Sequence, residues 1–295
     1  MLTGLKFCRF QTPDGVSFGV SDGRLLYDLS GLNSVTFRDL DSLYSAAEND
    51  VSKMVEIAAD AMKKARKLPY NYTVLKLPLR PAEIWAAGVT YLRSRQARES
   101  ETKTKGLYDY VYEATRPELF LKDTGARCRG PNEEVAVRSD SNWSVPEPEL
   151  TVVCDKETKV VGYVAGNDVS SRDIEGENPL YLPQAKVYKA SSSVGPVVVT
   201  ADEIGDPHTL EIKMKIRRDG RDVFQGSTNT SQMKRTVPEL LSFLKRDNVL
   251  NTFTLLMTGT SIVPPDNFTL QTGDTVEIEV EKIGTLLNSV RKLGD

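Results

Sequence analysis

Residues 144–150 (SVPEPEL) place Glu147 and Glu149 two positions apart, directly before an apolar stretch. In extended backbone both carboxylates point to one face, and the neighbouring prolines favour that conformation because they fix φ. Asp168 adds a third carboxylate at the end of the next predicted strand. Three carboxylates with coordination positions left open suit Mg²⁺, Mn²⁺ or Ca²⁺. The alternative is an exposed acidic edge strand followed by an Asx turn, and the prolines themselves predict an edge or rim position.

The chain of 295 residues contains one histidine, His208. A Ser-His-Asp triad, a histidine-rich zinc site or a histidine proton shuttle would each have to be built around it. His208 follows Asp206 and Pro207 and precedes a strand-like stretch, so we interpret it as a surface loop residue. Acid–base chemistry therefore falls to carboxylates, lysine, tyrosine or a metal-bound water.

Composition excludes several classes of partner. The net charge is −3, from 38 basic and 41 acidic residues, and the pI is about 5.5. The chain therefore lacks the excess of basic residues that is typical of a nucleic-acid-binding protein. No stretch approaches the ~18 apolar residues that a membrane span needs. Cys8, Cys128 and Cys154 lie far apart, without the spacing of a zinc site or a disulfide framework. We expect a soluble cytoplasmic protein that binds neither nucleic acid nor membrane.

The N-terminal part reads as a small unit of hairpins and helices. Residues 5–30 alternate apolar and polar positions around Asp-Gly turns at 14–15 and 22–23, which favour tight hairpins. Residues 39–67 carry apolar side chains at three- and four-residue spacings, which predicts one or two amphipathic helices. Proline-containing residues 67–72 read as a linker, so we predict a small N-terminal domain over 1–75 and a catalytic domain over 76–295.

The second part is mostly predicted strand. Long sequence separations and Pro/Gly punctuation favour an α+β fold whose mixed β-sheet is rolled on itself. Thr236, Pro238 and Glu239 predict a helix start through a capping-box pattern. Residues 91–115 are charged and then aromatic, which is typical either of a solvated surface helix or of a mobile lid over a site. The predicted strands are 135–138, 149–155, 160–167, 195–200, 210–217, 222–226, 253–258 and 274–282.

Three strings, in this order, resemble the fumarylacetoacetate hydrolase family: 146–150 (PEPEL), 167–173 (NDVSSRD) and 283–290 (IGTLLNSV). The likeness covers about residues 80–295. It implies a rolled β fold, a catalytic divalent metal, most simply Mg²⁺, held by Glu147, Glu149 and Asp168, and 2-oxo acid substrates. It also implies a homodimer or homotetramer.

The resemblance further suggests roles for individual residues. Lys186, within 184–188 (QAKVY), matches the family's active-site lysine. Arg172, Thr285 and Thr90 match positions that face substrate. Hydrolases of the family carry a lid histidine in a Gly-x-Asn-Tyr-x-x-His segment, whereas residues 88–94 here read GVTYLRS, with Ser94 in the place of that histidine. Because a serine without a base is a poor proton acceptor, hydrolysis is in doubt.

Residues 112–122, 137–141 and 177–184 resemble a subgroup of the family that dehydrates sugar acids. This implies Mg²⁺-dependent loss of water from a 2-oxo sugar acid, 2-dehydro-3-deoxy-D-pentonate, to give 2,5-dioxopentanoate. Metal chelation of the carboxylate and ketone would stabilise an enolate. We expect Glu118, with a raised pKa, and Lys186, with a lowered pKa, to act as acid and base in an order that the sequence leaves open.

Other interpretations stay open at this point. The chain could be an acylpyruvate hydrolase, isomerase or decarboxylase of the same family, or a non-catalytic protein that binds 2-oxo acids. Glu118 could simply form an ion pair with Arg116 or Lys122.

Overall fold

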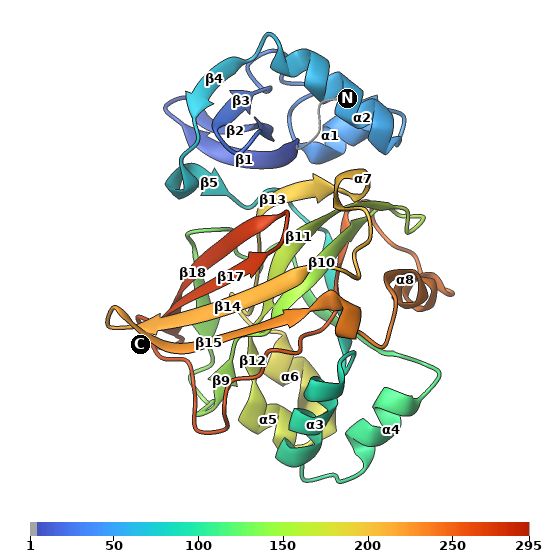
Figure 1. The fold of residues 1–295 in the computed structure, drawn as a ribbon, viewed down its shortest axis with the longest axis vertical. Helices are drawn as coiled ribbons and strands as arrows, with labels where there is room; N and C mark the ends of the chain where they lie inside the picture. Colours follow the sequence, from blue (N-terminus) through green and yellow to red (C-terminus); the bar gives the residue numbers. More distant parts are fainter. Residues whose placement is uncertain (1–4, 295) are drawn as a thin grey trace.

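Two β-sheets packed face to face form the centre of the protein (Figure 1). The computed structural model describes residues 5–294. Within them, the larger sheet has eleven strands in the order β4-β3-β2-β1-β13-β11-β10-β16-β6-β7, with β5 pairing β1, and the smaller has five in the order β15-β14-β17-β18-β8. The pairs β6–β16 and β8–β18 are parallel, and the other pairs of these sheets are antiparallel. The predicted α+β fold with a mixed, rolled sheet is confirmed.

The elements have the following bounds. The strands are β1 (Lys6–Thr12), β2 (Gly15–Ser21), β3 (Leu25–Asp28), β4 (Arg66–Pro69), β5 (Leu75–Lys76), β6 (Glu83–Gly88), β7 (Glu118–Thr124), β8 (Glu134–Val137), β9 (Ser144–Val145), β10 (Pro148–Cys154), β11 (Val160–Asp168), β12 (Ser170–Ser171), β13 (Ser192–Thr200), β14 (Glu211–Arg218), β15 (Arg221–Asn229), β16 (Thr254–Met257), β17 (Thr275–Val280) and β18 (Gly284–Lys292). The helices are α1 (Leu40–Ala46), α2 (Val51–Met62), α3 (Leu92–Glu101), α4 (Leu107–Glu113), α5 (Arg172–Glu177), α6 (Leu182–Lys186), α7 (Ala201–Ile204) and α8 (Val237–Lys245).

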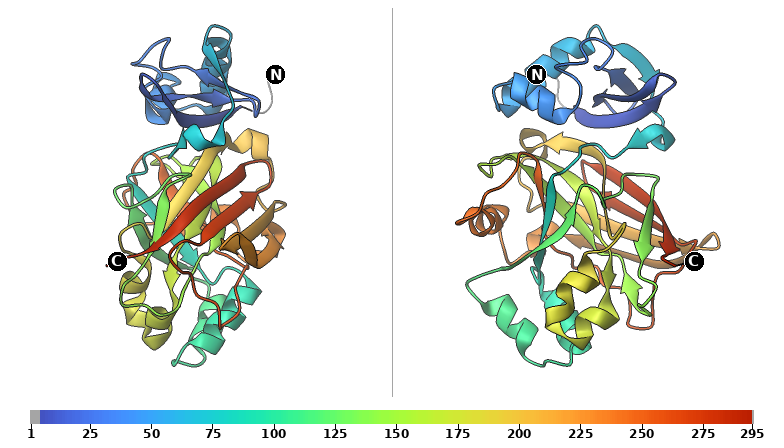
Figure 2. Two further views of the ribbon diagram at one scale, coloured as in Figure 1. Left: turned by 90° about the vertical axis from the view of Figure 1, so that its left-hand side faces the viewer. Right: turned by 180° about the vertical axis from the view of Figure 1, so that it is seen from behind.

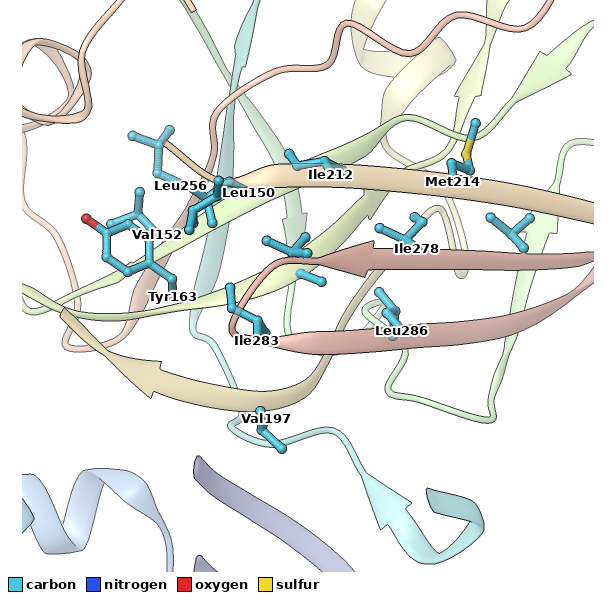
Figure 3. Close-up of a cluster of buried hydrophobic side chains, with 14 of the residues drawn as sticks. Leu150, Val152, Tyr163, Val197, Ile212, Met214, Leu256, Ile278, Ile283 and Leu286 are labelled. Atoms are coloured by element: carbon cyan, nitrogen blue, oxygen red, sulfur yellow. The ribbon is translucent and has the colours of Figure 1, made fainter. Parts of the chain in front are cut away.

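The main core lies between the two sheets. In β14 the buried positions alternate with exposed ones, so that Ile212 and Met214 point inward while their charged neighbours face solvent. They belong to the same buried cluster as Leu150 and Val152, which come from β10 of the larger sheet (Figure 3). Burying an aliphatic side chain of this kind stabilises the fold by about 1.5–3 kcal/mol. This apolar layer fixes the relative position of the strands that carry the functional side chains.

The N-terminal elements gather at one end of the long axis, and α3 to α6 lie at the other end (Figures 1 and 2). Both predicted hairpins are present, since β1 pairs β2 and β2 pairs β3. The predicted linker is in part wrong, because Arg66–Pro69 forms β4 against β3. Strand β5 lies at the predicted boundary and pairs β1, which also pairs β13. The division at residue 75 stays a prediction.

Helix α8 begins as the capping pattern predicts: the Thr236 hydroxyl accepts a hydrogen bond from the Glu239 amide at 3.3 Å. His208 is not simply a loop residue without a partner. Its Nε2 accepts a hydrogen bond from the Val237 amide at 3.3 Å, which satisfies a free N–H in the first turn of the same helix.

Candidate active site

Five neighbouring strands of the larger sheet bring the candidate residues to one end. The register pairs Pro148 with Asn167, Thr151 with Met257, Met257 with Ala86, and Gly88 with Glu118. One end of the sheet is therefore formed by the start of β10, the end of β11, the ends of β16 and β6, and the start of β7. Helices α3, α5 and α6 lie beyond this end of the sheet (Figure 1).

Glu147, Glu149 and Asp168 form a compact carboxylate cluster. One oxygen from each lies within 4.8 Å of the others, and the three residues are 5%, 1% and 1% exposed. The alternative of an exposed acidic edge is therefore wrong. Of the predicted edge or rim position, the edge is wrong, because β10 pairs β11 on one side and β16 on the other. The prolines are tolerated because the β16 pairing begins only at Thr151.

Glu147 is surrounded by cations. Lys186 Nζ lies 3.0 Å from Oε2, and the guanidinium groups of Arg98 and Arg172 lie 2.7 and 3.2 Å from Oε1. Burial alone would raise the pKa of Glu147, but these three positive charges hold it well below its ordinary value. Glu147 is therefore ionised at neutral pH.

Glu149 has the opposite environment. Its Oε2 accepts one hydrogen bond, from the Gly259 amide at 2.6 Å, and no ion pair to it is found among residues 5–294. Burial, followed by the charges of Asp168 and Glu147, raises the pKa of Glu149 well above its ordinary value. A buried carboxylate without a cation is costly, so this environment fits a bound metal ion.

The charged groups in and behind the cluster do not balance. If every carboxylate is ionised, six carboxylates face four basic side chains, and one divalent cation would supply the two missing positive charges. The carboxylates belong to Glu101, Glu118, Glu147, Glu149, Asp168 and Glu175, and the cations to Arg98, Lys122, Arg172 and Lys186. The oxygen-only donor set is the one that Mg²⁺ prefers.

Lys186 ends α6 and projects into the cluster. Its ammonium uses three contacts, to Glu147, to Asp168 at 3.1 Å and to the Ser170 hydroxyl at 2.5 Å. The lowered pKa was expected for a lysine beside a bound dication, so it stays a prediction for the metal-bound site. Burial would lower the pKa of Lys186, but the Asp168 and Glu147 carboxylates raise it above its ordinary value. Lys186 is thus positioned as a cation.

Glu118, the first residue of β7, lines the same cavity and is partly buried. Burial, reinforced by the nearby Glu175 carboxylate, raises the pKa of Glu118 to about 7, in the expected direction. The alternative of an ordinary ion pair is not observed within residues 5–294. Lys122 instead lies 2.8 Å from Asp168, and Arg116 lies over the ring of Phe243.

Helices α3 and α4 cover the site. Ser94, Arg98 and Tyr108 line the cavity from these helices and are buried, so residues 91–115 are not merely a solvated surface segment. The cavity leaves about 20 Å³ of free space, roughly room for one water molecule. This space is smaller than a substrate-sized ligand needs.

Three residues expected to face substrate lie elsewhere. Arg172 and Thr90 are buried behind the cavity wall, where Arg172 pairs with Glu101 at 2.8 Å and the Thr90 hydroxyl donates to the Thr258 carbonyl at 2.6 Å. Thr285 lies in β18 opposite Glu279 of β17, and it does not line the cavity. The expectation for Thr285 is therefore not supported, because its strand belongs to the smaller sheet.

Sequence reasoning missed four residues of the site. Thr260 lines the cavity after Gly259, whose φ of +94° bends the chain at the end of β16. The sequence signal that could have identified Thr260 was a polar residue directly after a glycine at the end of a strand. Arg98 and Glu175 also line the cavity, and Lys122 is fully buried beside it. These three charged residues carried no local signal.

No helix in residues 5–294 is long and apolar enough to span a bilayer. Residues 83–291 match the family described as fumarylacetoacetate (FAA) hydrolase, C-terminal. A probable 2-keto-3-deoxyxylonate dehydratase of Haloferax volcanii is 47% identical over 90% of this chain and 91% of its own length. A 2-dehydro-3-deoxy-D-arabinonate dehydratase of Saccharolobus solfataricus is 48% identical over 73% of this chain and 74% of its own.

A solved structure of 2-keto-3-deoxy-D-arabinonate dehydratase, complexed with magnesium and 2,5-dioxopentanoate, has the same fold. Its TM-score to this chain is 0.80 at 37% sequence identity, and the alignment covers 97% of this chain and 99% of the other.

Proposed function

Because the chain belongs to the fumarylacetoacetate hydrolase family, we propose that it is a Mg²⁺-dependent dehydratase that converts 2-dehydro-3-deoxy-D-pentonate to 2,5-dioxopentanoate. The observation that carries this proposal is the cavity itself. Three buried carboxylates, Lys186 and Glu118 converge there under a cover that presents Ser94. None of the described residues that line it is a histidine.

The metal fits the residues present. Glu147, Glu149 and Asp168 would hold Mg²⁺, and Glu149 is the ligand whose buried charge has no other cation. When bound, the ion would supply Lewis-acid stabilisation of the negative charge that develops on the 2-oxo group. The protein supplies the proton transfers.

Glu118 is the group that we assign to proton transfer at C3 and C4. A pKa near 7 gives a useful fraction of carboxylate for removing the C3 proton, and the resulting acid can protonate the departing C4 hydroxyl. Breaking the C3–H and C4–O bonds releases water and leaves a C3=C4 double bond. Transfer of a proton from C5 to C3 and tautomerisation of the resulting enol then give the C5 aldehyde.

Lys186 remains charged in this scheme. Its ammonium is held by Glu147, Asp168 and Ser170, so we assign it to stabilising the enolate electrostatically. The sequence left the order of acid and base open between Glu118 and Lys186, and this scheme gives both proton transfers to Glu118. Arg172 and Thr90 act as positioning residues, the first through Glu147 and the second through the Thr258 carbonyl beside Gly259.

The direct test is turnover. Purified protein incubated with 2-dehydro-3-deoxy-D-arabinonate and Mg²⁺ should release 2,5-dioxopentanoate, measured as the aldehyde, and excess chelator should abolish the reaction. Absence of product with both Mg²⁺ and Mn²⁺ would refute the proposal. Faster turnover of acetylpyruvate than of the deoxy sugar acid would favour a hydrolase. Binding of 2-oxo acids without any turnover would favour a non-catalytic binding protein.

The proposal includes a homodimer or homotetramer in the cytoplasm. The three cysteines are buried and unpaired, in keeping with a reducing compartment. Light scattering after size exclusion measures the oligomer. We also keep residues 1–75 as a proposed separate domain, since no described residue before Ala87 lines the cavity.

A further inference from the structure

Arg98 and Glu175 form an ion pair in the cavity wall. Arg98 comes from α3 in the cover, and Glu175 comes from α5, which follows the carboxylate cluster in sequence. The Arg98 guanidinium donates a hydrogen bond to Glu175, and both side chains are more than nine-tenths buried. The same guanidinium reaches Glu147 at 2.7 Å and Glu101 at 3.6 Å. Three protein carboxylates therefore share its single charge.

The other cation that lines the cavity is also engaged. Lys186 directs its ammonium to Glu147, Asp168 and the Ser170 hydroxyl, which matches the three donors that an ammonium has. Among the described residues that line the cavity, Arg98 and Lys186 are the only basic ones. Within residues 5–294, no positive side chain of the cavity wall is thus left to receive a carboxylate at the end of a substrate remote from the metal.

The groups available to that end of a substrate are acceptors and hydroxyls. Glu175 and Glu118 present carboxylate oxygens, and Ser94, Tyr108 and Thr260 also line the wall. A substrate hydroxyl can donate a hydrogen bond to Glu175, whereas a second substrate carboxylate would face it as a like charge in a buried site. Juxtaposed like charges discriminate strongly between ligands.

We propose that the cavity selects 2-oxo monocarboxylates over 2-oxo dicarboxylates, and that Glu175 determines this selection by occupying Arg98 and repelling a second carboxylate. The inference rests on the proposed function, in which the metal binds the 1-carboxylate and 2-oxo group that both classes share. Glu175 thus has a role in specificity that is separate from the roles of the carboxylate cluster and Lys186.

The test compares two five-carbon probes that differ only at C5, 2-oxopentanoate and 2-oxopentanedioate. Their affinities for the full-length protein with saturating Mg²⁺ are measured by calorimetry. In the wild type the dicarboxylate should bind at least about 30-fold more weakly, the scale expected for an uncompensated like-charge contact. Glu175→Gln keeps the side chain's shape, allows its amide to donate to the second carboxylate, and should reduce that ratio about tenfold or more.

The matched control is Glu177→Gln on the same helix. Glu177 is exposed and does not line the cavity, and its substitution removes the same charge. The ratio of the affinities for the two probes should therefore stay at the wild-type value. Equal binding of the two probes by the wild type would overturn the inference and leave the dehydratase proposal standing. So would an unchanged ratio in Glu175→Gln. If neither probe binds in the presence of Mg²⁺, both the inference and the proposed function are refuted.

Discussion

Replacing Gly88 by alanine should slow turnover about 100-fold without unfolding the protein. Gly88 ends β6 directly opposite Glu118, the first residue of β7. A Cβ atom added at Gly88 would lie 2.1 Å from Glu118 Oε2 and 2.6 Å from its Cδ. The glycine therefore makes room for the carboxylate to which we assign proton transfer.

The size of the effect follows from this clash. Oε2 must retreat by about 1.3 Å to reach the 3.4 Å at which ordinary contact begins. Misplacing a reacting group by roughly 1 Å costs about 100-fold in rate. The retreat itself is inexpensive because the clashing atoms belong to a flexible side chain, and alanine in a strand is favoured over glycine by about 0.5–1 kcal/mol. We therefore expect kcat to fall about 100-fold while the Tm stays the same or rises slightly.

The assay is a double-mutant cycle on kcat with thermal melts of each variant. Glu118→Gln alone should lower kcat by about 10²–10⁴-fold, the usual contribution of a general acid or base. Gly88→Ala added to Glu118→Gln should then have little further effect, because the carboxylate is already gone. Full additivity of the two changes, or a Gly88→Ala enzyme as active as the wild type, would refute the assignment of Glu118.

Three further outcomes are expected. In the metal-free protein, the raised pKa of Glu149 means that the fold holds this proton more tightly than the unfolded chain does, so the Tm measured in chelator should fall as pH rises above the ordinary glutamate range. Glu149→Gln should lessen that fall and should lose the stabilisation that Mg²⁺ gives the wild type. If the Tm of Glu149→Gln fell with pH as steeply as that of the wild type, Glu149 would not be the buried group that loses its proton. Lys186→Ala should retain Mg²⁺ binding by calorimetry and lose about 10²-fold or more in kcat, whereas a fully active variant would remove Lys186 from the mechanism. With Glu118 as the base, kcat/KM should increase with pH through about 7, and a decrease there would make Glu118 the initial acid instead.

Local sequence signals predicted what local geometry determines. The Asp-Gly turns gave the β1–β2 and β2–β3 hairpins, and Thr236 gave the start of α8. Glu147 and Glu149 lie close together because residues two positions apart in an extended backbone point to the same side. Asp168 joins them through the antiparallel β10–β11 pairing. Spacing therefore offered the carboxylate cluster as one of two alternatives, and the resemblance to the family favoured the metal site.

The remaining features depend on contacts between distant segments. Strand β6 went unpredicted because its partner β16 is parallel to it and far away in sequence, with Leu255 opposite Ile84. Arg98 lies in a charged stretch that looks solvated, and only the packing of α3 carries it to Glu147. The carboxylates that raise the pKa of Lys186 could not be foreseen, because Asp168, Glu147 and Glu175 come from separate segments of the chain.

The connection between β6 and β7 has an evolutionary consequence. These strands are hydrogen-bonded neighbours in an antiparallel pair, so α3 and α4 form an excursion of residues 89–117 from what is otherwise a hairpin. Such an excursion can change in length and sequence while the strands at its base stay paired. Glu147, Glu149 and Asp168 lie outside it. A new substrate range could therefore arise by replacing this one segment, and a graft from a relative is a modular starting point for redesign.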